Sequence, residues 1–407
     1  MPANNRFRHQ SYPTVPTVDP VVRPLSPELD EPADFSRLHV HLGVQRVLLV
    51  HGTFMGTDPF GVHAMMDGLV ERRTSPAMQL VLKPLVAKLA GQTKRVTDVV
   101  TGEVGNYKEA YRAHFQELCG GDPIVRRLEP TWSSSNTHLA RAELAIMLVN
   151  WLADLEADGL EPGRDRVLMW GHSHAGSAFA LLSNLLANER ESVSSFFDAA
   201  GDALGEAGER ARAFLEAAPT PHPWADSLFI VTFGAPVRYG WDTNGYRQLL
   251  HVIHHRSFDK EHPERTMPAI TIGCEDSSAV EVQRAIFDVL GARHGDWVQT
   301  FAIAGTDLPA AGNGAANLRL HKFLEASLDE ITPEKIRDRF AVNCPRWKTA
   351  TRMHADGRNL LIEFDKTGLT RFGRAHQAFL GHGVYTLSPW LPAQLALVIE
   401  WLERDAK

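Results

Sequence analysis

Short apolar runs alternate with longer amphipathic stretches along most of the chain. Apolar runs bounded by turn residues predict strands buried on both faces of a sheet. They lie at 46–50, 124–128, 166–170, 228–234, 249–254 and 359–364. Apolar positions at helical spacing predict helices at 61–92, 138–156, 175–186, 315–340 and 388–404, with Asn136 as a candidate cap. This alternation predicts an α/β fold with a parallel or mostly parallel central sheet flanked by helices.

The pattern is interrupted at three places. Residues 1–35 are rich in proline and polar residues, which predicts an extended N-terminal arm before a single domain over 36–407. Residues 188–226 predict amphipathic helices inserted after the helix at 175–186, and 258–295 predict a second insertion, part loop and part helix. These insertions form either a lid over a binding pocket, or extra packing or an oligomer contact, and the sequence favours neither alternative.

Composition narrows the classes of partner. The 407 residues carry a formal net charge of −7, which argues against nucleic acid, because phosphate binding needs clustered Lys and Arg. No apolar run approaches the ~20 residues of a membrane span. The first twenty residues lack the apolar core of a secretory signal, so we expect a cytoplasmic protein unless a signal has been removed. A homo-oligomer is not indicated.

The cysteines agree with a reduced compartment. Cys119, Cys274 and Cys344 are far apart, odd in number, and form no Cys-x-x-Cys pair. A zinc site made of thiolates is therefore not expected.

The most informative motif is Gly171-His172-Ser173-His174-Ala175-Gly176, directly after the apolar run 167–170. A strand that ends in Gly-x-Ser-x-small and enters a helix is typical of a nucleophile elbow. This pattern predicts that Ser173 is a nucleophile at the end of a sheet. His172 and His174 should point away from its hydroxyl, so neither is expected to be the base.

A serine nucleophile needs donors for an oxyanion and a base. The donors are predicted to be the backbone N–H groups of Thr53, in the turn after the first strand, and of His174. The base is predicted to be His382, which lies between two glycines after the last strand, because the base comes last in this chain order. Other histidines, among them His138, His321 and His354, are expected at the surface or in the core.

Three aspartates are candidates for the acid that orients the base. Asp296 begins an Asp-x-Val element after the second insertion and is favoured; Asp307 ends an apolar run and comes second; Asp259 is third. Each could also be an ordinary turn aspartate.

His251, His254 and His255 invite a metal interpretation. On a strand, however, His251 and His255 face one way and His254 the other, and no carboxylate stands at a recognisable spacing. Neither a metal nor a cofactor is therefore expected.

The segments 47–53, 171–176 and 381–383 together resemble the α/β-hydrolase superfamily, in its bacterial lipase and esterase branch. Thr232-Phe233-Gly234-Ala235-Pro236-Val237 and Asp296-Trp297-Val298 resemble further elements of those enzymes; Ala175 stands where glycine is usual. The resemblance implies an eight-stranded, mostly parallel sheet, helical lid insertions and a Ser173–Asp296–His382 triad. It also implies acyl transfer from a small-molecule or lipid-like ester. An amidase, thioesterase or acyltransferase would use the same residues, and a non-catalytic binding module is the alternative of another class.

Overall fold

The predicted strand runs pair with one another in a single parallel sheet. The computed structural model describes residues 7, 21–52, 106–255, 295–300, 307, 314–325, 353–364 and 382–404. Within them the strand order is β1-β7-β6-β5-β4-β2-β3, and every pairing is parallel. The strands are β1 (Arg23–Leu25), β2 (Val44–Val50), β3 (Ile124–Arg127), β4 (Arg166–His172), β5 (Leu228–Phe233), β6 (Gln248–His254) and β7 (Arg358–Phe364). The prediction of an α/β fold with a parallel sheet is confirmed, with seven strands in the described residues where the resemblance implied eight.

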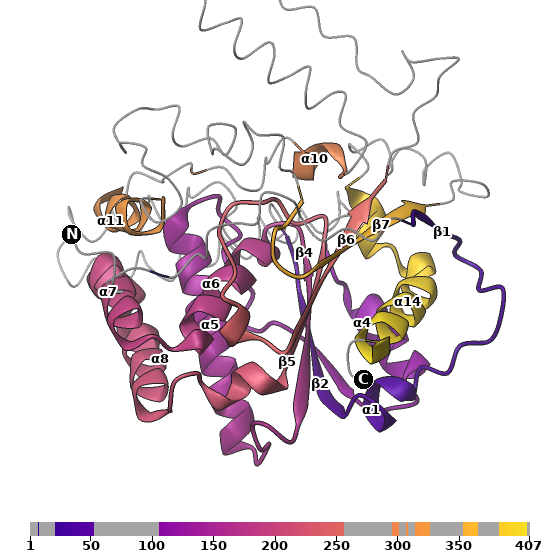
Figure 1. Cartoon of the computed structure of the whole chain (residues 1–407), viewed down its shortest axis with the longest axis horizontal. Helices are drawn as coiled ribbons and strands as arrows, with labels where there is room; N and C mark the ends of the chain where they lie inside the picture. Colours follow the sequence, from indigo (N-terminus) through magenta and orange to yellow (C-terminus); the bar gives the residue numbers. More distant parts are fainter. Residues whose placement is uncertain are drawn as a thin grey trace, which may run out of the picture.

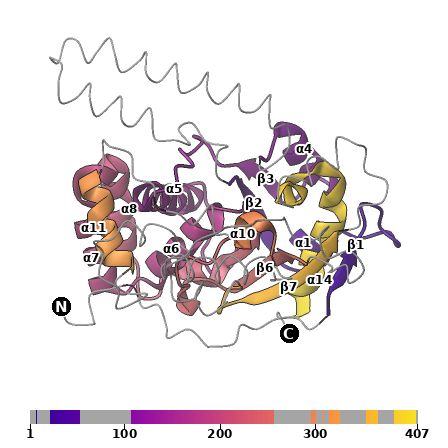
Figure 2. The same cartoon turned by 90° about the horizontal axis from the view of Figure 1, so that it is seen from above.

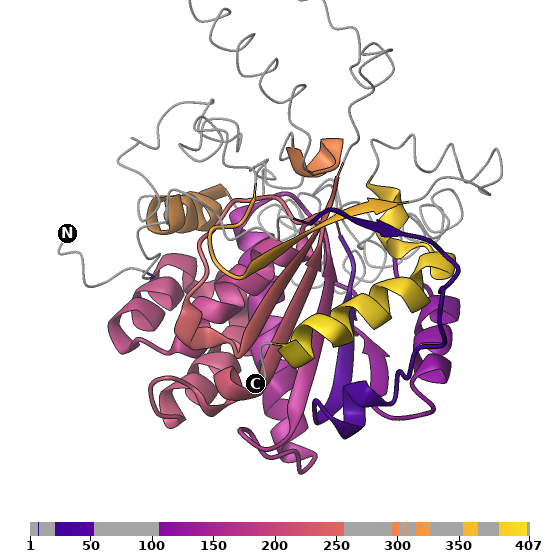
Figure 3. The same ribbon diagram turned by 45° about the vertical axis from the view of Figure 1, so that its right-hand side comes forward.

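Helices cover both faces of this sheet (Figure 1). One layer holds α5 (His138–Ala157), α6 (Ala175–Ala187), α7 (Arg190–Ala200), α8 (Gly205–Ala217) and α11 (Gly314–Glu325). The other holds α1 (Arg37–Val40), α4 (Glu109–Leu118) and α14 (Leu391–Arg404), and Figure 3 shows α14 lying across that face. No described helix is both long enough and apolar enough to cross a membrane.

The two-sided burial explains why the strands are apolar at successive positions. In β2, Leu48 and Val50 join the core cluster under α5 and α6, whereas Val47 and Leu49 join the cluster under α4 and α14. Side chains alternate between the faces of a strand, so both sets must be apolar when helices cover both faces.

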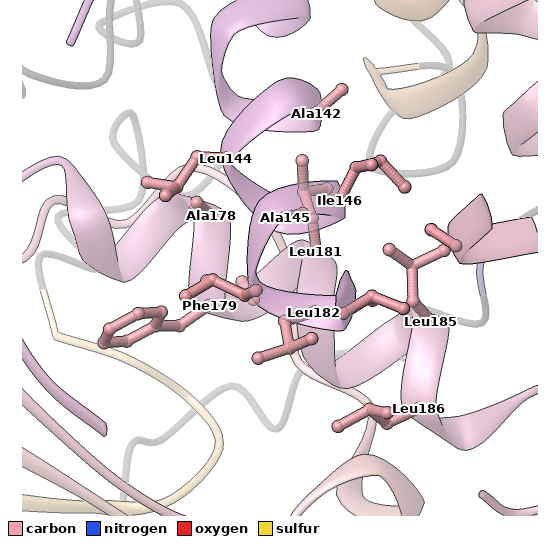
Figure 4. Packing of buried hydrophobic residues seen from close by; sticks show 14 of the residues in the cluster. Ala142, Leu144, Ala145, Ile146, Ala178, Phe179, Leu181, Leu182, Leu185 and Leu186 are labelled. Carbon is pink, nitrogen blue, oxygen red and sulfur yellow. The ribbon is translucent and has the colours of Figure 1, made fainter. Parts of the chain in front are cut away.

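Helix α6 lies at the centre of the first layer, and all of its residues are buried. A helix surrounded by protein is apolar all round, as this one is. Figure 4 shows Ala178, Leu181 and Leu185 of α6 in the cluster that Ala142 and Ala145 of α5 also enter. This packing fixes the position of the residues just before α6.

The first insertion forms α7, η2 (Gly201–Leu204), α8 and η3 (Pro223–Ser227). Helix α8 packs against α5, and α7 packs against α11. Phe196 and Phe197 are buried in the same core cluster as α5 and α6. In the described structure the insertion therefore thickens the helical layer, which corresponds to the packing alternative.

Two local predictions need correction. The residue that caps α5 is Thr137, whose Oγ1 accepts the N–H of Ala140 at 3.0 Å, and not Asn136. The N-terminal arm contains the short strand β1, which pairs with β7 at the edge of the sheet. Pro24 can lie in this strand because an edge strand leaves one side without ladder bonds.

Several predicted segments lie outside the described residues. They are the helix at 61–92, most of the insertion at 258–295, residues 326–340 and most of the arm. Phe7 is described, and its ring stacks on Phe196 of α7 and contacts Phe323 of α11 edge-on.

Candidate active site at the carboxyl end of the sheet

Ser173 lies on the tight turn between β4 and α6. Its φ is +54°, in the left-handed region, and its side chain is buried. Such a conformation costs a residue other than glycine of order 1–2 kcal/mol, so the surrounding structure must enforce it. The Ser173 N–H donates to the carbonyl of Phe233 at 2.8 Å, which ties the turn to the end of β5.

The backbone that follows β2 also lies close to this turn. A Cβ atom at Gly52 would lie 2.8 Å from Cβ of Ser173 and 3.0 Å from Nδ1 of His172. Only glycine allows so close an approach of the two chains. The backbone after β2 therefore runs directly beside Ser173.

His382 and Asp296 form a buried pair. His382 precedes the short helix η9 (Gly383–Thr386), and Asp296 directly precedes α10 (Trp297–Thr300), which lies over the end of the sheet (Figure 2). Nδ1 of His382 is 2.8 Å from Oδ1 of Asp296. The same carboxylate oxygen accepts the N–H of Gln299 at 2.8 Å, so α10 fixes its orientation. The pair joins two segments that are distant in the sequence.

Gly234, the residue after β5, lies against this pair and follows the residue that binds the serine turn. A Cβ atom there would lie 2.7 Å from Oδ2 of Asp296 and 3.2 Å from Cε1 of His382. The preceding residue, Phe233, accepts the hydrogen bond from Ser173. Oγ of Ser173 and both ring nitrogens of His382 are buried, and none of these three atoms makes a well-aligned hydrogen bond among the described residues, although Nδ1 lies 2.8 Å from Asp296. Hydrogen bonds between catalytic groups are often long or misaligned before substrate binds.

The two histidines beside the serine have contacts of their own. Nε2 of His172 is 3.2 Å from the carbonyl oxygen of His382, and the two rings lie 4.4 Å apart. Nε2 of His174 accepts a hydrogen bond from Nε of Arg141 at 2.6 Å. Burial and the positive charge of Arg141 hold the pKa of His174 well below its usual range. His172 thus supports the loop that carries His382, and His174 is a neutral acceptor.

Sequence reasoning missed Arg141 and Tyr385. Arg141 is fully buried in α5, and Nη1 donates to the hydroxyl of Tyr239 at 2.9 Å. The Tyr385 hydroxyl accepts the N–H of His254 at 2.9 Å, and its ring borders His382. A charged residue in an apolar helical run was the only signal for Arg141, and nothing local marked Tyr385.

The other predicted site residues have three different outcomes. Asp307 lies away from His382 and contacts His138 and Asn317 instead. His174 is the N-cap residue of α6, and its role as an oxyanion donor stays a prediction. Thr53 and Asp259 lie outside the described residues.

The His251 region is a hydrogen-bonded part of the core. Nδ1 of His251 is 2.7 Å from Oγ1 of Thr232, and Nε2 is 3.1 Å from the carbonyl oxygen of Asp356. Its ring stacks on His354 at 3.9 Å. Both ring nitrogens of His251 are therefore engaged by other groups.

A pocket of about 480 Å³ adjoins the end of β2. Its lining includes both apolar or aromatic and charged side chains: Leu49, His51, Tyr107, Leu128, Lys108, Glu109, Arg127 and Glu129. His51 belongs to its wall and directly precedes Gly52, which contacts the serine turn. The pocket and the site are thus neighbours.

Comparison with protein-family models, with curated proteins and with solved structures found no match to this chain. Its function must therefore be argued from the geometry and chemistry of the site.

Proposed function

We propose that this chain is a serine carboxylic-ester hydrolase of the esterase or lipase type, built on an α/β-hydrolase fold. Ser173 would be the nucleophile, His382 the base and Asp296 the acid. The proposal rests on a strained, buried serine whose N–H binds the carbonyl of Phe233, next to a glycine that lies against a buried histidine–aspartate pair. A serine hydroxyl is a weak nucleophile until an oriented base removes its proton.

In the first half of the reaction, Oγ of Ser173 attacks the carbonyl carbon of the ester while Nε2 of His382 takes the hydroxyl proton. Asp296 accepts from Nδ1–H, which keeps Nε2 free for that proton and stabilises the imidazolium. The negative charge that develops on the carbonyl oxygen is bound by the backbone N–H groups of His174 and Thr53. The α6 dipole adds to this stabilisation, because the oxyanion lies at the helix N-terminus.

The tetrahedral intermediate collapses when the carbon–oxygen bond to the alcohol breaks. Nε2–H of His382 gives its proton to the leaving alkoxide, and the acyl group remains on Ser173. Water then attacks the acyl-enzyme by the reverse path, with His382 again as base, and releases the acid.

The first experiment asks whether Ser173 is a reactive nucleophile. We expect a fluorophosphonate probe to label one serine, identified as Ser173 by peptide mass spectrometry, and p-nitrophenyl esters from acetate to palmitate to be turned over. Ser173→Ala should abolish labelling and lower kcat by at least about 10⁴-fold. Absence of both labelling and turnover would favour a non-catalytic binding module.

Ser177 provides a matched control for this experiment. It is also a buried serine at the start of α6, and its hydroxyl also has no hydrogen-bond partner among the described residues. Ser177→Ala should keep both labelling and turnover. Equal losses in the two variants would show that the effect is structural, and the proposal would fail.

A further inference from the structure

A second cluster of reactive side chains lies away from Ser173. His138, Asp307 and His321 each offer one ligand atom, and these atoms all lie within 4.8 Å of one another. All three side chains are buried. His138 is the first residue of α5 and His321 lies on α11, so the cluster joins separate segments of the chain.

The spacing of the ligand atoms suits a small tetrahedral ion. Nε2 of His138 is 3.1 Å from Nδ1 of His321 and 3.6 Å from Oδ2 of Asp307. An ion with ligand bonds of ~2.0–2.2 Å at tetrahedral angles separates its ligand atoms by about 3.4 Å. The two observed separations lie on either side of this value, so small side-chain movements would complete the geometry.

Two of the three candidate ligands, His138 and Asp307, each make a hydrogen bond to a neighbouring side chain, as ligands of metal sites usually do. Nδ1 of His138 is 2.6 Å from the hydroxyl of Tyr239, which also accepts from Arg141. Nδ2 of Asn317 donates to Oδ1 and Oδ2 of Asp307 at 2.9 and 3.1 Å. With the proton of His138 on Nδ1 and donated to Tyr239, Nε2 presents its lone pair to the cluster.

The charges around the cluster select for a metal that binds imidazole well. Arg141 lies beside the cluster, because it donates to the Tyr239 hydroxyl that His138 contacts. This cation opposes a dication, and the Asp307 carboxylate supplies a compensating negative charge. Calcium and magnesium prefer six or more oxygen ligands, whereas zinc binds two imidazoles and a carboxylate readily.

We propose that His138, Asp307 and His321 bind a Zn²⁺ ion, with water in the fourth position. The ion would fasten α11 and the chain at Asp307 to the N-terminus of α5. In the alternative without metal, Nε2–H of His138 donates a hydrogen bond within the cluster and no ion binds.

The test uses the full chain made without a polyhistidine tag. The protein is stripped with dipicolinate, dialysed, and titrated with Zn²⁺ or Co²⁺. We expect about one ion per chain by elemental analysis and the visible absorption of tetrahedral Co²⁺. Saturating Zn²⁺ should also raise Tm by ~3 °C or more. These measurements on wild-type protein do not depend on esterase activity.

Variants locate the ion. His321→Ala should weaken Zn²⁺ binding at least about 100-fold, and Asn317→Ala about 10-fold through the loss of an outer partner. His222→Asn is the matched control, because His222 is buried elsewhere, and it should bind Zn²⁺ as wild type does. The proposal is overturned if stripped wild-type protein takes up no ion, or if His321→Ala binds it with unchanged affinity. If His321→Ala does not fold, Asn317→Ala and the wild-type titration decide.

Discussion

Two buried histidine–aspartate pairs occur in this molecule, and their surroundings differ. His382 and Asp296 approach to 2.8 Å, and His138 and Asp307 approach to 3.6 Å. In the first pair neither ring nitrogen makes a well-aligned hydrogen bond among the described residues, and the ring lies 4.4 Å from that of His172, which precedes the strained Ser173. In the second pair both ring nitrogens of the histidine contact other polar groups, Tyr239 and His321.

A histidine–aspartate pair does not by itself define a function. A base needs a nitrogen that faces a proton donor such as a serine hydroxyl. A metal ligand needs a nitrogen that faces other ligand atoms. In the second pair Nε2 of His138 meets both Asp307 and His321, whereas in the first pair Nε2 of His382 points away from its aspartate and has no partner among the described residues. This difference is the ground for proposing coordination at the second pair and proton transfer at the first.

The largest expected effect comes from changing one aspartate at a time. Asp296→Asn should lower kcat about 10⁴-fold, because the amide no longer stabilises the imidazolium or the correct tautomer of His382. Asp307→Asn should lower kcat at most about tenfold and should instead lower Tm. For both variants, steady-state kinetics on a p-nitrophenyl ester measures kcat, and thermal unfolding measures Tm.

The two asparagine variants control for one another, because each removes one buried carboxylate charge and keeps the shape. If Asp307→Asn lost more activity than Asp296→Asn, the roles assigned to the two pairs would be reversed.

An intermediate effect is expected at Gly234. Gly234→Ala places a Cβ atom against Asp296 and His382 and should lower kcat about 100-fold by moving the pair. Gly205 also has a positive φ, +51° against +58°, but nothing lies within 4 Å of a Cβ atom there. Gly205→Ala should therefore cost about 1 kcal/mol of stability and leave kcat unchanged. Similar kcat values for the two variants would contradict the placement of the pair over Gly234.

The smallest effect concerns His222, a buried histidine for which the described structure shows no carboxylate contact. Burial lowers its pKa from 6.5 to about 4. Above pH 6.5 the ring is neutral in both states and stability is unaffected. As the pH falls toward 4, His222 is protonated in the unfolded chain before it is protonated in the folded chain. This difference lowers the free energy of unfolding by about 2 kcal/mol at about pH 5.

His222→Asn should reduce the loss of stability between about pH 7.5 and about pH 5. The asparagine side chain can still accept the N–H of Trp224, as His222 does. Urea unfolding at about pH 7.5 and about pH 5 gives the difference between wild type and variant. An unchanged pH dependence would show that burial alone does not set the pKa of His222.

Local sequence was sufficient where one short pattern decides the structure. The apolar runs at 166–170 and 228–234 became β4 and β5, and the small residues around Ser173 predicted a tight turn between strand and helix. Local sequence was insufficient for β1, because three residues that include a proline carry no strand pattern. They form a strand only because β7 offers them an edge with which to pair. It also failed for the cap of α5, since both Asn136 and Thr137 are good capping residues.

The sequence by itself determined every described strand except β1, the serine turn, and the order of serine, aspartates and histidine along the chain. These follow from contacts between near neighbours, which residue type and spacing encode. Only the tertiary structure placed Asp296 beside His382 and Asp307 beside His138. The two aspartates have similar local surroundings in the sequence, and their partners come from distant segments. Which partner each one meets depends on how the helices pack against the sheet.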